Sequence, residues 1–249
     1  MGKITVITGG TSGIGRGIAE KILAESAKTD RIFVTYGHDE KKALSFQESL
    51  PEEKRSQVTL IKADMSSYEE MMVFVEELKK QTDHIDWLVS NAGISTYAKY
   101  EDYSFEEWTR IVNTNLSVPV FMVKEFMPVM TEGGRVLFSV LFTGSYAGQQ
   151  AYSSSLVYGV TKAAIHFLTR SLVKEFEPKG ITVNAIAPGF IETPWHSART
   201  QESYDRINRK IALHRFGTVE EVADMAYAVL SNGYMNGSVV DIHGGYDYF

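Results

Sequence analysis

The chain has 249 residues, of which 44% are hydrophobic and 22% charged, a composition typical of an ordinary soluble globular protein. Its net charge of −6 and pI of about 5.6 make nucleic acid and anionic membranes improbable partners. The absence of cysteine excludes disulfides and thiolate chemistry, and the six histidines show no metal-ligand spacing, so no metal is expected. Neither a leader pattern nor an apolar run of the ~20 residues that span a membrane is present, which predicts a cytoplasmic protein.

Short apolar runs alternate with longer amphipathic stretches along the chain, a pattern typical of βαβ units and a parallel sheet. The predicted strands are residues 4–8, 31–35, 58–62, 87–90, 135–140, 182–187 and 238–242. The predicted helices are residues 13–26, 40–50, 68–81, 106–130, 155–176 and 219–230. No linker, composition shift or repeat divides the sequence, so we predict a single domain over residues 1–249.

The first predicted strand leads directly into a glycine-rich turn, Thr8-Gly-Gly-Thr-Ser-Gly-Ile-Gly15, which opens the first helix. Three of its glycines, Gly9, Gly13 and Gly15, lack a Cβ that would keep a phosphate away from the backbone. Backbone N–H groups and the helix N-terminus could therefore approach a pyrophosphate. The same glycines elsewhere would make an ordinary turn, but between strand and helix they predict a dinucleotide site.

The end of the second strand normally selects between NAD and NADP. An acid there binds the adenosine ribose hydroxyls and repels a 2′-phosphate. Tyr36 stands at this position, which favours NADP and leaves NAD open. No arginine occupies the usual partner position, where Ser12 stands; His38, Lys41 or Lys42 could reach the phosphate or simply belong to a solvated helix start.

Polar residues follow the third and fourth strands, at the edge where such sheets bind ligands. Asp64 comes after the third strand and is equally well a turn residue or an adenine contact, and Asn91-Ala-Gly93 follow the fourth. Asn115 lies in the predicted helix 106–130 among apolar neighbours, so it needs a hydrogen-bond partner if it is buried.

Tyr158 and Lys162 are four residues apart in the predicted helix 155–176, which puts both side chains on one helical face. A phenol has a pKa of about 10, and a nearby ammonium favours its ionised form, so Tyr158 could act as a proton shuttle. One such pair arises by chance in a chain rich in tyrosine and lysine, and a half-buried Tyr beside a solvated Lys is the simpler interpretation. Only the surrounding motifs can decide.

Taken in order, these motifs resemble those of the short-chain dehydrogenases/reductases, in the compact single-domain branch, over about residues 3–245. The sequence contains each motif of the family pattern in order. TGxxxGxG is Thr8 to Gly15, the Asp after strand three is Asp64, NAG is Asn91 to Gly93, and the helical Asn is Asn115. The Ser is Ser145, YxxxK is Tyr158 with Lys162, and PG followed by Thr is Pro188-Gly189 with Thr193. The resemblance implies a Rossmann-type α/β fold, a doubly wound parallel sheet of about seven strands with helices on both faces. It also implies an NAD(P)(H)-dependent oxidoreductase that interconverts a small-molecule carbonyl and an alcohol by hydride transfer.

The resemblance also implies residue roles. Tyr158 would be the general acid/base, Ser145 would orient the substrate oxygen, Lys162 would bind the nicotinamide ribose and lower the Tyr158 pKa, and Asn115 would anchor a water that links Lys162 to solvent. The implied cofactor-binding residues are Gly9, Thr11, Ser12, Gly13, Ile14, Gly15, Tyr36, His38, Asp64, Met65, Asn91, Ala92, Gly93, Tyr158, Lys162, Pro188, Gly189, Ile191 and Thr193.

The segment before Ser145 departs from the family pattern, because it is about four residues longer than the norm. The fifth strand is therefore expected to run on or to bulge. Counted from the preceding glycine pair, the serine position falls near Ser139 or Val140. Counted from Tyr158 it falls on Ser145, which we prefer because the serine and the tyrosine must meet one substrate oxygen.

The remaining expectations concern substrate and assembly. Residues 192–216 resemble the family's substrate lid, with Trp195, His196 and Tyr204 as candidate contacts, although a surface helical excursion would look the same. A 3-oxoacyl thioester, a sugar or polyol, and a cyclic ketone remain open as substrates, and the acidic surface disfavours an acidic acyl carrier protein. The family implies a homotetramer, or else a homodimer. The alternative function is a non-catalytic nucleotide-sensing or regulatory protein on the same fold.

Overall fold

The computed structural model describes residues 2–96, 98–139, 156–194 and 199–246. Their strands are β1 (Ile4–Ile7), β2 (Arg31–Tyr36), β3 (Val58–Lys62), β4 (Ile85–Ser90), β5 (Met130–Ser139), β6 (Thr182–Pro188) and β7 (Val239–Ile242). Their α-helices are α1 (Gly13–Glu25), α2 (Glu40–Ser49), α3 (Glu52–Arg55), α4 (Tyr68–Gln81), α5 (Phe105–Val112), α6 (Val118–Phe126), α7 (Leu156–Phe176), α8 (Gln201–Asn208) and α9 (Val219–Ser231).

The seven strands form one parallel sheet in the order β3-β2-β1-β4-β5-β6-β7. The chain builds outward from β1 to β3 and then returns, so that β4 pairs with the other side of β1, with Thr5 opposite Trp87. At this reversal the connections on the two sides leave in opposite directions, which opens a crevice at the carboxyl ends of β1 and β4. The sheet therefore has the doubly wound topology predicted from the sequence.

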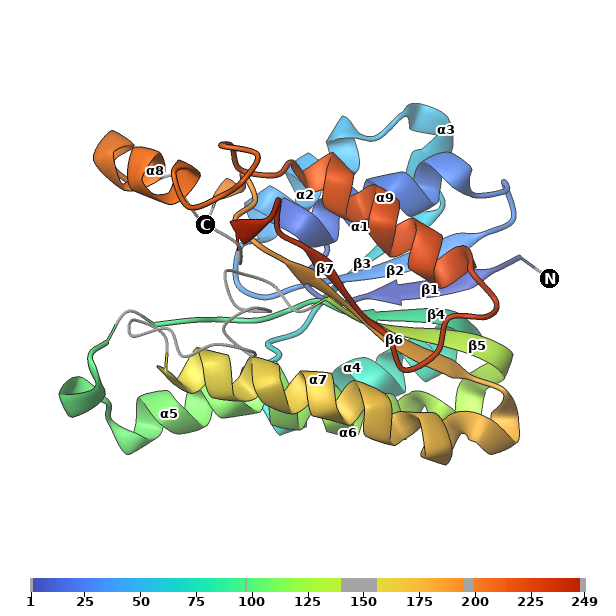
Figure 1. The fold of residues 1–249 in the computed structure, drawn as a ribbon. Helices are drawn as coiled ribbons and strands as arrows, with labels where there is room; N and C mark the ends of the chain where they lie inside the picture. Colours follow the sequence, from blue (N-terminus) through green and yellow to red (C-terminus); the bar gives the residue numbers. More distant parts are fainter. Residues whose placement is uncertain (1, 97, 140–155, 195–198, 247–249) are drawn as a thin grey trace.

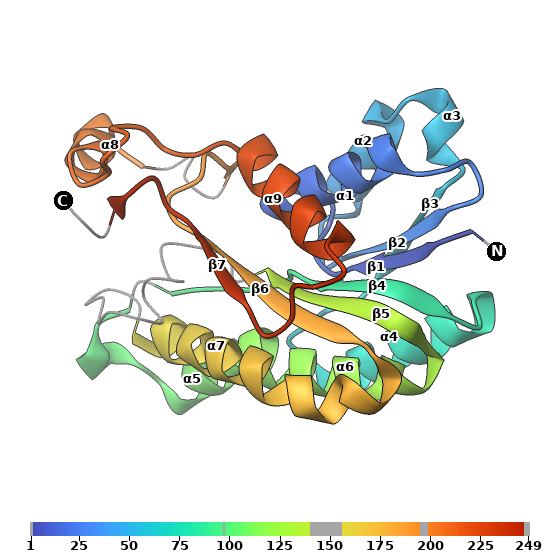
Figure 2. The same cartoon turned by 45° about the vertical axis from the view of Figure 1, so that its right-hand side comes forward.

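Helices cover both faces of the sheet (Figures 1 and 2): α4, α5, α6 and α7 lie on one face, and α1, α2 and α9 on the other. On the first face, the rings of Phe74 and Phe126 meet edge to face at 5.7 Å. On the second, α1 and α9 touch so closely that a Cβ on Gly17 would lie 2.2 Å from Cγ1 of Val219. The two apolar layers bury both faces of the central strands, as a parallel sheet requires.

The predicted helix 106–130 is wrong in its extent. It is interrupted between α5 and α6 by a π-helical turn at Asn113–Ser117, where the N–H of Val118 donates to the carbonyl of Asn113. Pro119 in the first turn of α6 has no N–H for the carbonyl four residues earlier, so a regular α-helix would lose a hydrogen bond here. Apolar periodicity continues on both sides of the turn and therefore does not reveal it.

Strand β5 begins earlier than predicted and is irregular near its start. Ile85 pairs with Met130 but Trp87 with Arg135, so extra residues bulge out of β5. Gly133 in this bulge has a φ of +72°. The bulge that the sequence predicted before Ser145 falls in residues outside the described part of the chain. The other predicted boundaries agree within one or two residues, while α3 and α8 have no counterpart among the predicted elements.

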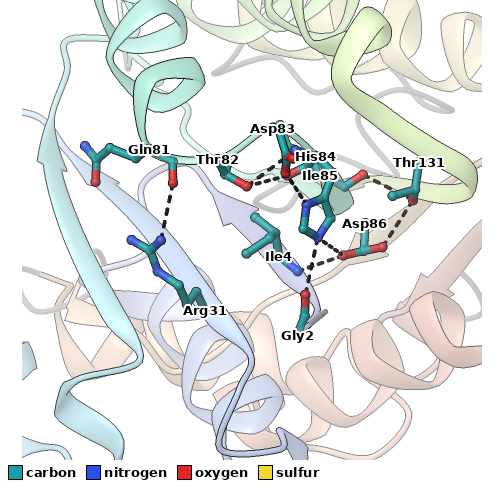
Figure 3. A network of polar contacts seen from close by, with 10 residues as sticks. All are labelled: Gly2, Ile4, Arg31, Gln81, Thr82, Asp83, His84, Ile85, Asp86 and Thr131. Atoms are coloured by element: carbon teal, nitrogen blue, oxygen red, sulfur yellow. Dashed lines mark hydrogen bonds and ion pairs between the residues drawn. The ribbon is translucent and has the colours of Figure 1, made fainter.

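A polar network ties the amino ends of β1 and β4 together, at the end of the sheet away from the crevice (Figure 3). His84 Nδ1 lies 2.8 Å from Asp83 Oδ1, and His84 Nε2 lies 3.3 Å from the carbonyl oxygen of Gly2. Asp86 accepts a hydrogen bond of 2.7 Å from the N–H of Ile4. Side chains thus hydrogen-bond backbone groups at the start of β1 and in the residues just before it.

Candidate active site

The glycine turn after β1 forms the floor of the candidate site. Gly9 and Gly13 have φ values of +62° and +52°, a left-handed conformation that favours glycine. A Cβ on Gly15 would lie 2.3 Å from Asn91 Nδ2 and 2.4 Å from the carbonyl oxygen of Gly9. At these three glycines the turn thus has no side chain that would cover its backbone N–H groups at the start of α1. A dinucleotide pyrophosphate requires such accessible N–H groups.

Thr8 and Asn91 lock this turn to the carboxyl end of β4. The Thr8 hydroxyl accepts hydrogen bonds of 3.0 Å from the N–H groups of both Asn91 and Ala92. The Asn91 amide donates to the carbonyl oxygens of Thr8 and Gly9 at 3.0 and 3.1 Å. The predicted cofactor residue Asn91 therefore shapes the turn, while its Oδ1 is buried without a hydrogen bond within the described structure.

A cleft of about 520 Å³ opens above the turn. Twelve of the predicted cofactor-binding residues line it: Gly9, Ser12, Gly13, Ile14, His38, Asp64, Met65, Asn91, Ala92, Gly93, Tyr158 and Thr193. The other predicted cofactor residues are not among the described residues of its lining: Thr11, Gly15, Tyr36, Lys162, Pro188, Gly189 and Ile191. The cleft is large enough and its floor bare enough for a dinucleotide, so the residues present fit a nicotinamide cofactor.

Charged side chains gather at the end of the cleft beside β2 and β3. His38 Nε2 lies 3.4 Å from Asp64 Oδ2, and Asp64 Oδ1 accepts a hydrogen bond of 2.8 Å from the N–H of Ser66. Burial alone would raise the Asp64 pKa, but the Ser66 hydrogen bonds, helped by His38 and Arg110, hold this pKa below its usual value. Lys42 also lines this end of the cleft.

Sequence reasoning missed Arg110 and gave Lys42 no committed role. Both line the cleft, but Arg110 comes from α5 and Lys42 from α2, far from the motifs in sequence. Only the alternation of strands and helices could have indicated that these two residues lie at the cleft. Each helix that follows a strand starts near the carboxyl ends of the strands, where the cleft is. The two residues add positive charge to the lining of the cleft.

Tyr158 and Lys162 lie on one face of α7, as the four-residue spacing predicts, and both are buried there. The Tyr158 hydroxyl is buried with no hydrogen-bond partner in the described ranges, and Tyr158 lines the cleft. Lys162 Nζ lies 5.0 Å from the centre of the Tyr158 ring and 3.6 Å from the place that a Cβ on Gly93 would occupy. The pair therefore faces the loop that follows β4.

The pKa values of this pair differ from the expectation. Burial raises the pKa of Tyr158 well above its usual value of 10.0 and lowers the pKa of Lys162 to about 7. The sequence predicts the opposite direction for Tyr158, because four-residue spacing reveals a charge partner but not the depth of burial. Here the desolvation of both groups dominates. Tyr158 consequently holds its proton, and Lys162 titrates near neutral pH.

Asn115 sits in the π-helical turn, buried, with the hydrogen-bond partners that the sequence analysis required of it. Its Oδ1 accepts from the N–H of Ile94 at 2.9 Å, and its Nδ2 donates to the carbonyl oxygen of Ile94 at 2.8 Å. The same Nδ2 donates to Thr161 Oγ1 at 3.2 Å. Its Oδ1 also lies 3.2 Å from the place of a Cβ on Gly93.

The end of β6 closes the cleft from the opposite side. Gly189 packs so tightly on β7 that its Cβ would lie 2.7 Å from Cβ of His243, and Ile191 belongs to the apolar layer beside α1 and α9. Thr193 instead reaches back toward the glycine turn, with its methyl carbon 3.7 Å from the place of a Cβ on Gly13. Of the predicted residues in this segment, Thr193 is the one that lines the cleft.

Several predicted residues lie outside the described part of the chain: Ser145, and Trp195 and His196 of the lid segment. The competing serine position, Ser139, ends β5 with a buried hydroxyl that has no partner in the described ranges. Ser139 is not among the described residues that line the cleft. Across these ranges there is also no group of three or more His, Asp or Glu side chains placed to hold a metal, and no helix long and apolar enough to cross a membrane.

Comparison with known proteins gives matches along nearly the whole chain. A family model described as enoyl-(acyl carrier protein) reductase matches residues 9–247. The 3-oxoacyl-[acyl-carrier-protein] reductase FabG of Aquifex aeolicus is 34% identical over 252 residues, covering 98% of this chain and 97% of that protein. The acetoacetyl-CoA reductase of Rhizobium meliloti is 30% identical over 252 residues, covering 100% of each protein.

Solved structures agree with these matches. A short-chain dehydrogenase/reductase from Serratia marcescens, 25% identical, has a TM-score of 0.87 over 99% of this chain and 98% of that one. A blue fluorescent protein from a metagenomic library, solved in complex with NADPH and 26% identical, has a TM-score of 0.88 over 98% of each chain. Since the family model and its relatives span the chain, the protein belongs to the short-chain dehydrogenase/reductase family.

Proposed function

We infer that this protein is an NADP(H)-dependent oxidoreductase that interconverts a small-molecule carbonyl compound and an alcohol. The observation that carries the inference is the buried Tyr158 hydroxyl on the wall of a cleft whose floor is a bare glycine turn. The relatives reported above are reductases, and one structural neighbour was solved with NADPH. The nucleotide-sensing alternative finds no support among them.

We propose for the side chains the roles that the family resemblance implies. NADPH, when bound, supplies a hydride from C4 of its nicotinamide. Tyr158 donates a proton to the carbonyl oxygen during reduction and takes it back during oxidation. We assign Ser145 to the same substrate oxygen as an orienting hydrogen-bond donor. Lys162, beside Gly93, binds the nicotinamide ribose, and Asn115 anchors the water that returns protons to Lys162.

The substrate class that we propose is a 3-oxoacyl thioester. Both relatives named above reduce, by their names, a 3-oxoacyl group carried on a thioester. Coenzyme A is favoured over an acyl carrier protein as the carrier, because this chain has a net charge of −6 and acidic carrier proteins dock on basic surfaces. A second candidate reaction is reduction of an enoyl thioester, because the matching family model is described as an enoyl-(acyl carrier protein) reductase.

We further propose one domain over residues 1–249 with a substrate lid at about residues 192–216. The proposal of a lid is supported by the helix that this segment contains, α8. Ile207 of α8 packs in a small apolar cluster with Phe190 and Phe216. In that cluster the rings of Phe190 and Phe216 lie 5.4 Å apart. The cluster is separate from the two large apolar layers on the sheet, as expected of a lid that moves independently of them.

The proposed assembly is a homotetramer, with a homodimer as the next choice, formed through α5, α6 and α7. Its support is apolar surface on these helices: Phe105 is 85% exposed and Phe167 is 73% exposed, and Phe121 and Val160 add to it. Light scattering at several protein concentrations tests the state, and Phe167→Glu is expected to dissociate it. The proposed location is the cytoplasm, to be checked by cell fractionation.

The decisive experiment follows NADPH oxidation by the purified protein with acetoacetyl-CoA and, separately, with crotonyl-CoA, which carries a C=C bond in place of the ketone. We expect turnover of acetoacetyl-CoA, and a loss of about 10³-fold in kcat in Tyr158→Phe with NADPH affinity kept within about 3-fold. Tyr227→Phe is the matched control, because Tyr227 packs on Trp87 away from the cleft. Turnover of crotonyl-CoA alone would establish the enoyl chemistry instead. No turnover of these or of a broad carbonyl panel would overturn the function.

A further inference from the structure

Thr161 lies between Tyr158 and Lys162 in sequence, and its side chain is fully buried at 0% exposure. Its hydroxyl donates to the carbonyl oxygen of Tyr158 at 2.7 Å. The Thr161 hydroxyl oxygen, Oγ1, in turn accepts a hydrogen bond of 3.2 Å from Asn115 Nδ2. A single hydroxyl therefore joins the turn of α7 that carries the reactive pair to the π-helical turn that carries Asn115.

Asn115 continues this connection to the loop after β4. Its side chain hydrogen-bonds both backbone groups of Ile94: it accepts from the N–H at 2.9 Å and donates to the carbonyl oxygen at 2.8 Å. Ile94 lines the cleft directly after Gly93, the residue that lies against Lys162 Nζ. The path from Thr161 through Asn115 to Ile94 thus spans from the acid/base helix to the cofactor side of the cleft.

We propose that Thr161 is a positioning residue for the reaction: through Asn115 it holds the loop at Ile94 in register with Tyr158 and Lys162. The proposal rests on the function inferred above. Hydride and proton must reach one carbonyl group together, and a small misplacement of the acid relative to the cofactor slows such a step strongly. Thr161 would set that relative placement without touching substrate or cofactor.

The hydroxyl is required because it accepts and donates at once. A valine has the same shape but would leave one Asn115 N–H buried without its acceptor, and the amide could turn away from Ile94. A serine would keep both hydrogen bonds and lose a methyl group only. The chain also supplies a matched control in Thr169, equally buried on α7, whose hydroxyl donates to the carbonyl of Ile165 at 2.8 Å.

The test compares Thr161→Val, Thr161→Ser and Thr169→Val in the full-length protein. We expect Thr161→Val to lower kcat for acetoacetyl-CoA reduction by about 10- to 100-fold, with NADPH affinity within about 3-fold. Thr161→Ser should restore most of the rate, and Thr169→Val should keep it. Hydrogen exchange at the Ile94 amide gives a second readout without turnover: it should speed up in Thr161→Val only. In the Asn115→Ala background, Thr161→Val should cost little more, because both changes cut the same connection.

The proposal is overturned if Thr161→Val and Thr169→Val lose activity equally, if Thr161→Ser fails to restore the rate, or if Ile94 exchange is unchanged. Failure of the proposed function looks different. In that case the wild-type protein would turn over none of the carbonyl substrates, while the exchange experiment would still decide whether Thr161 holds Asn115 and Ile94.

Discussion

At Gly37, directly after β2, the cleft wall has room for a side chain. A Cβ at this position would meet no described heavy atom within 4 Å, and its φ is not in the left-handed region. The end of β2 is where short-chain dehydrogenases/reductases and other dinucleotide-binding folds read the 2′ position of the adenosine ribose. His38 is 83% exposed here and lies near Asp64, which offsets its charge when the ring is protonated. The site therefore has space for a stronger phosphate ligand.

We predict that Gly37→Arg increases the preference for NADPH over NADH by about 10-fold, because an arginine binds a phosphate with paired, charge-assisted hydrogen bonds. The ratio of the two dissociation constants, measured by nicotinamide fluorescence, checks it. Gly37→Gln has a similar length without the charge and should leave the ratio unchanged. Equal ratios in the wild type and in Gly37→Arg would show that the 2′-phosphate lies elsewhere.

Much of the site at this scale could be predicted from the sequence, because motif residues occupy fixed places at strand ends. The spacing of Tyr158 and Lys162 predicted that both lie on one helical face, and the apolar surroundings of Asn115 required the partners that it has. The direction of the Tyr158 pKa could not be predicted, since it depends on burial by residues distant in sequence. The position of Arg110 in the cleft could not be predicted either, because it depends on how α5 packs in the folded protein.

Among the elements, the break between α5 and α6 shows the limit of periodicity. The residues on both sides of Asn113–Ser117 keep one apolar face, so the pattern alone predicts one long helix. The π-helical turn widens the helix where Asn115 must point at the loop after β4. The signal that could have found it is Pro119, which removes an N–H from the helix interior.

Contact between α1 and α9 gives a prediction about an element. Replacing a helical glycine by alanine normally stabilises a protein by about 0.5–1 kcal/mol. A Cβ on Gly17 would instead lie 2.2 Å from Cγ1 of Val219, so α9 must shift. We expect Gly17→Ala to lower the free energy of unfolding by about 1–3 kcal/mol in urea denaturation. Gly233→Ala is the control: its Cβ would lie 3.7 Å from the flexible end of Arg135, so a change within about 0.5 kcal/mol is expected. Equal effects of the two substitutions would contradict the packing argument.

Across the whole molecule, the cleft and the polar network of Figure 3 lie at opposite ends of the parallel strands. All strands point the same way, so their carboxyl ends share one edge and carry the cleft. Their amino ends share the other edge, where the network in Figure 3 holds β1 against β4 and reaches β5 through Thr131, whose hydroxyl lies 3.2 Å from Asp86 Oδ1. Changes at the amino edge should therefore alter stability and leave the chemistry of the cleft intact.

His84 makes the stability of that edge depend on pH. The hydrogen bond to Asp83 raises the His84 pKa above its usual 6.5; partial burial opposes this, and the Gly2 carbonyl and Asp86 add to it. A raised pKa in the folded state means that His84 stabilises the protein fully below about pH 6.5 and that this contribution is lost as the pH rises through the folded pKa. Because the site is partly open to solvent, the contribution should be at most about 1 kcal/mol.

We therefore predict that His84→Gln lowers the free energy of unfolding at about pH 6 by up to about 1 kcal/mol more than at about pH 9, in urea denaturation at both values. Asp83→Asn removes the main cause of the raised pKa and should flatten the same pH dependence, while Tyr158-dependent turnover is kept in both variants. If His84→Gln costs the same at both pH values, folding does not raise the His84 pKa. The network would then act only through its backbone hydrogen bonds.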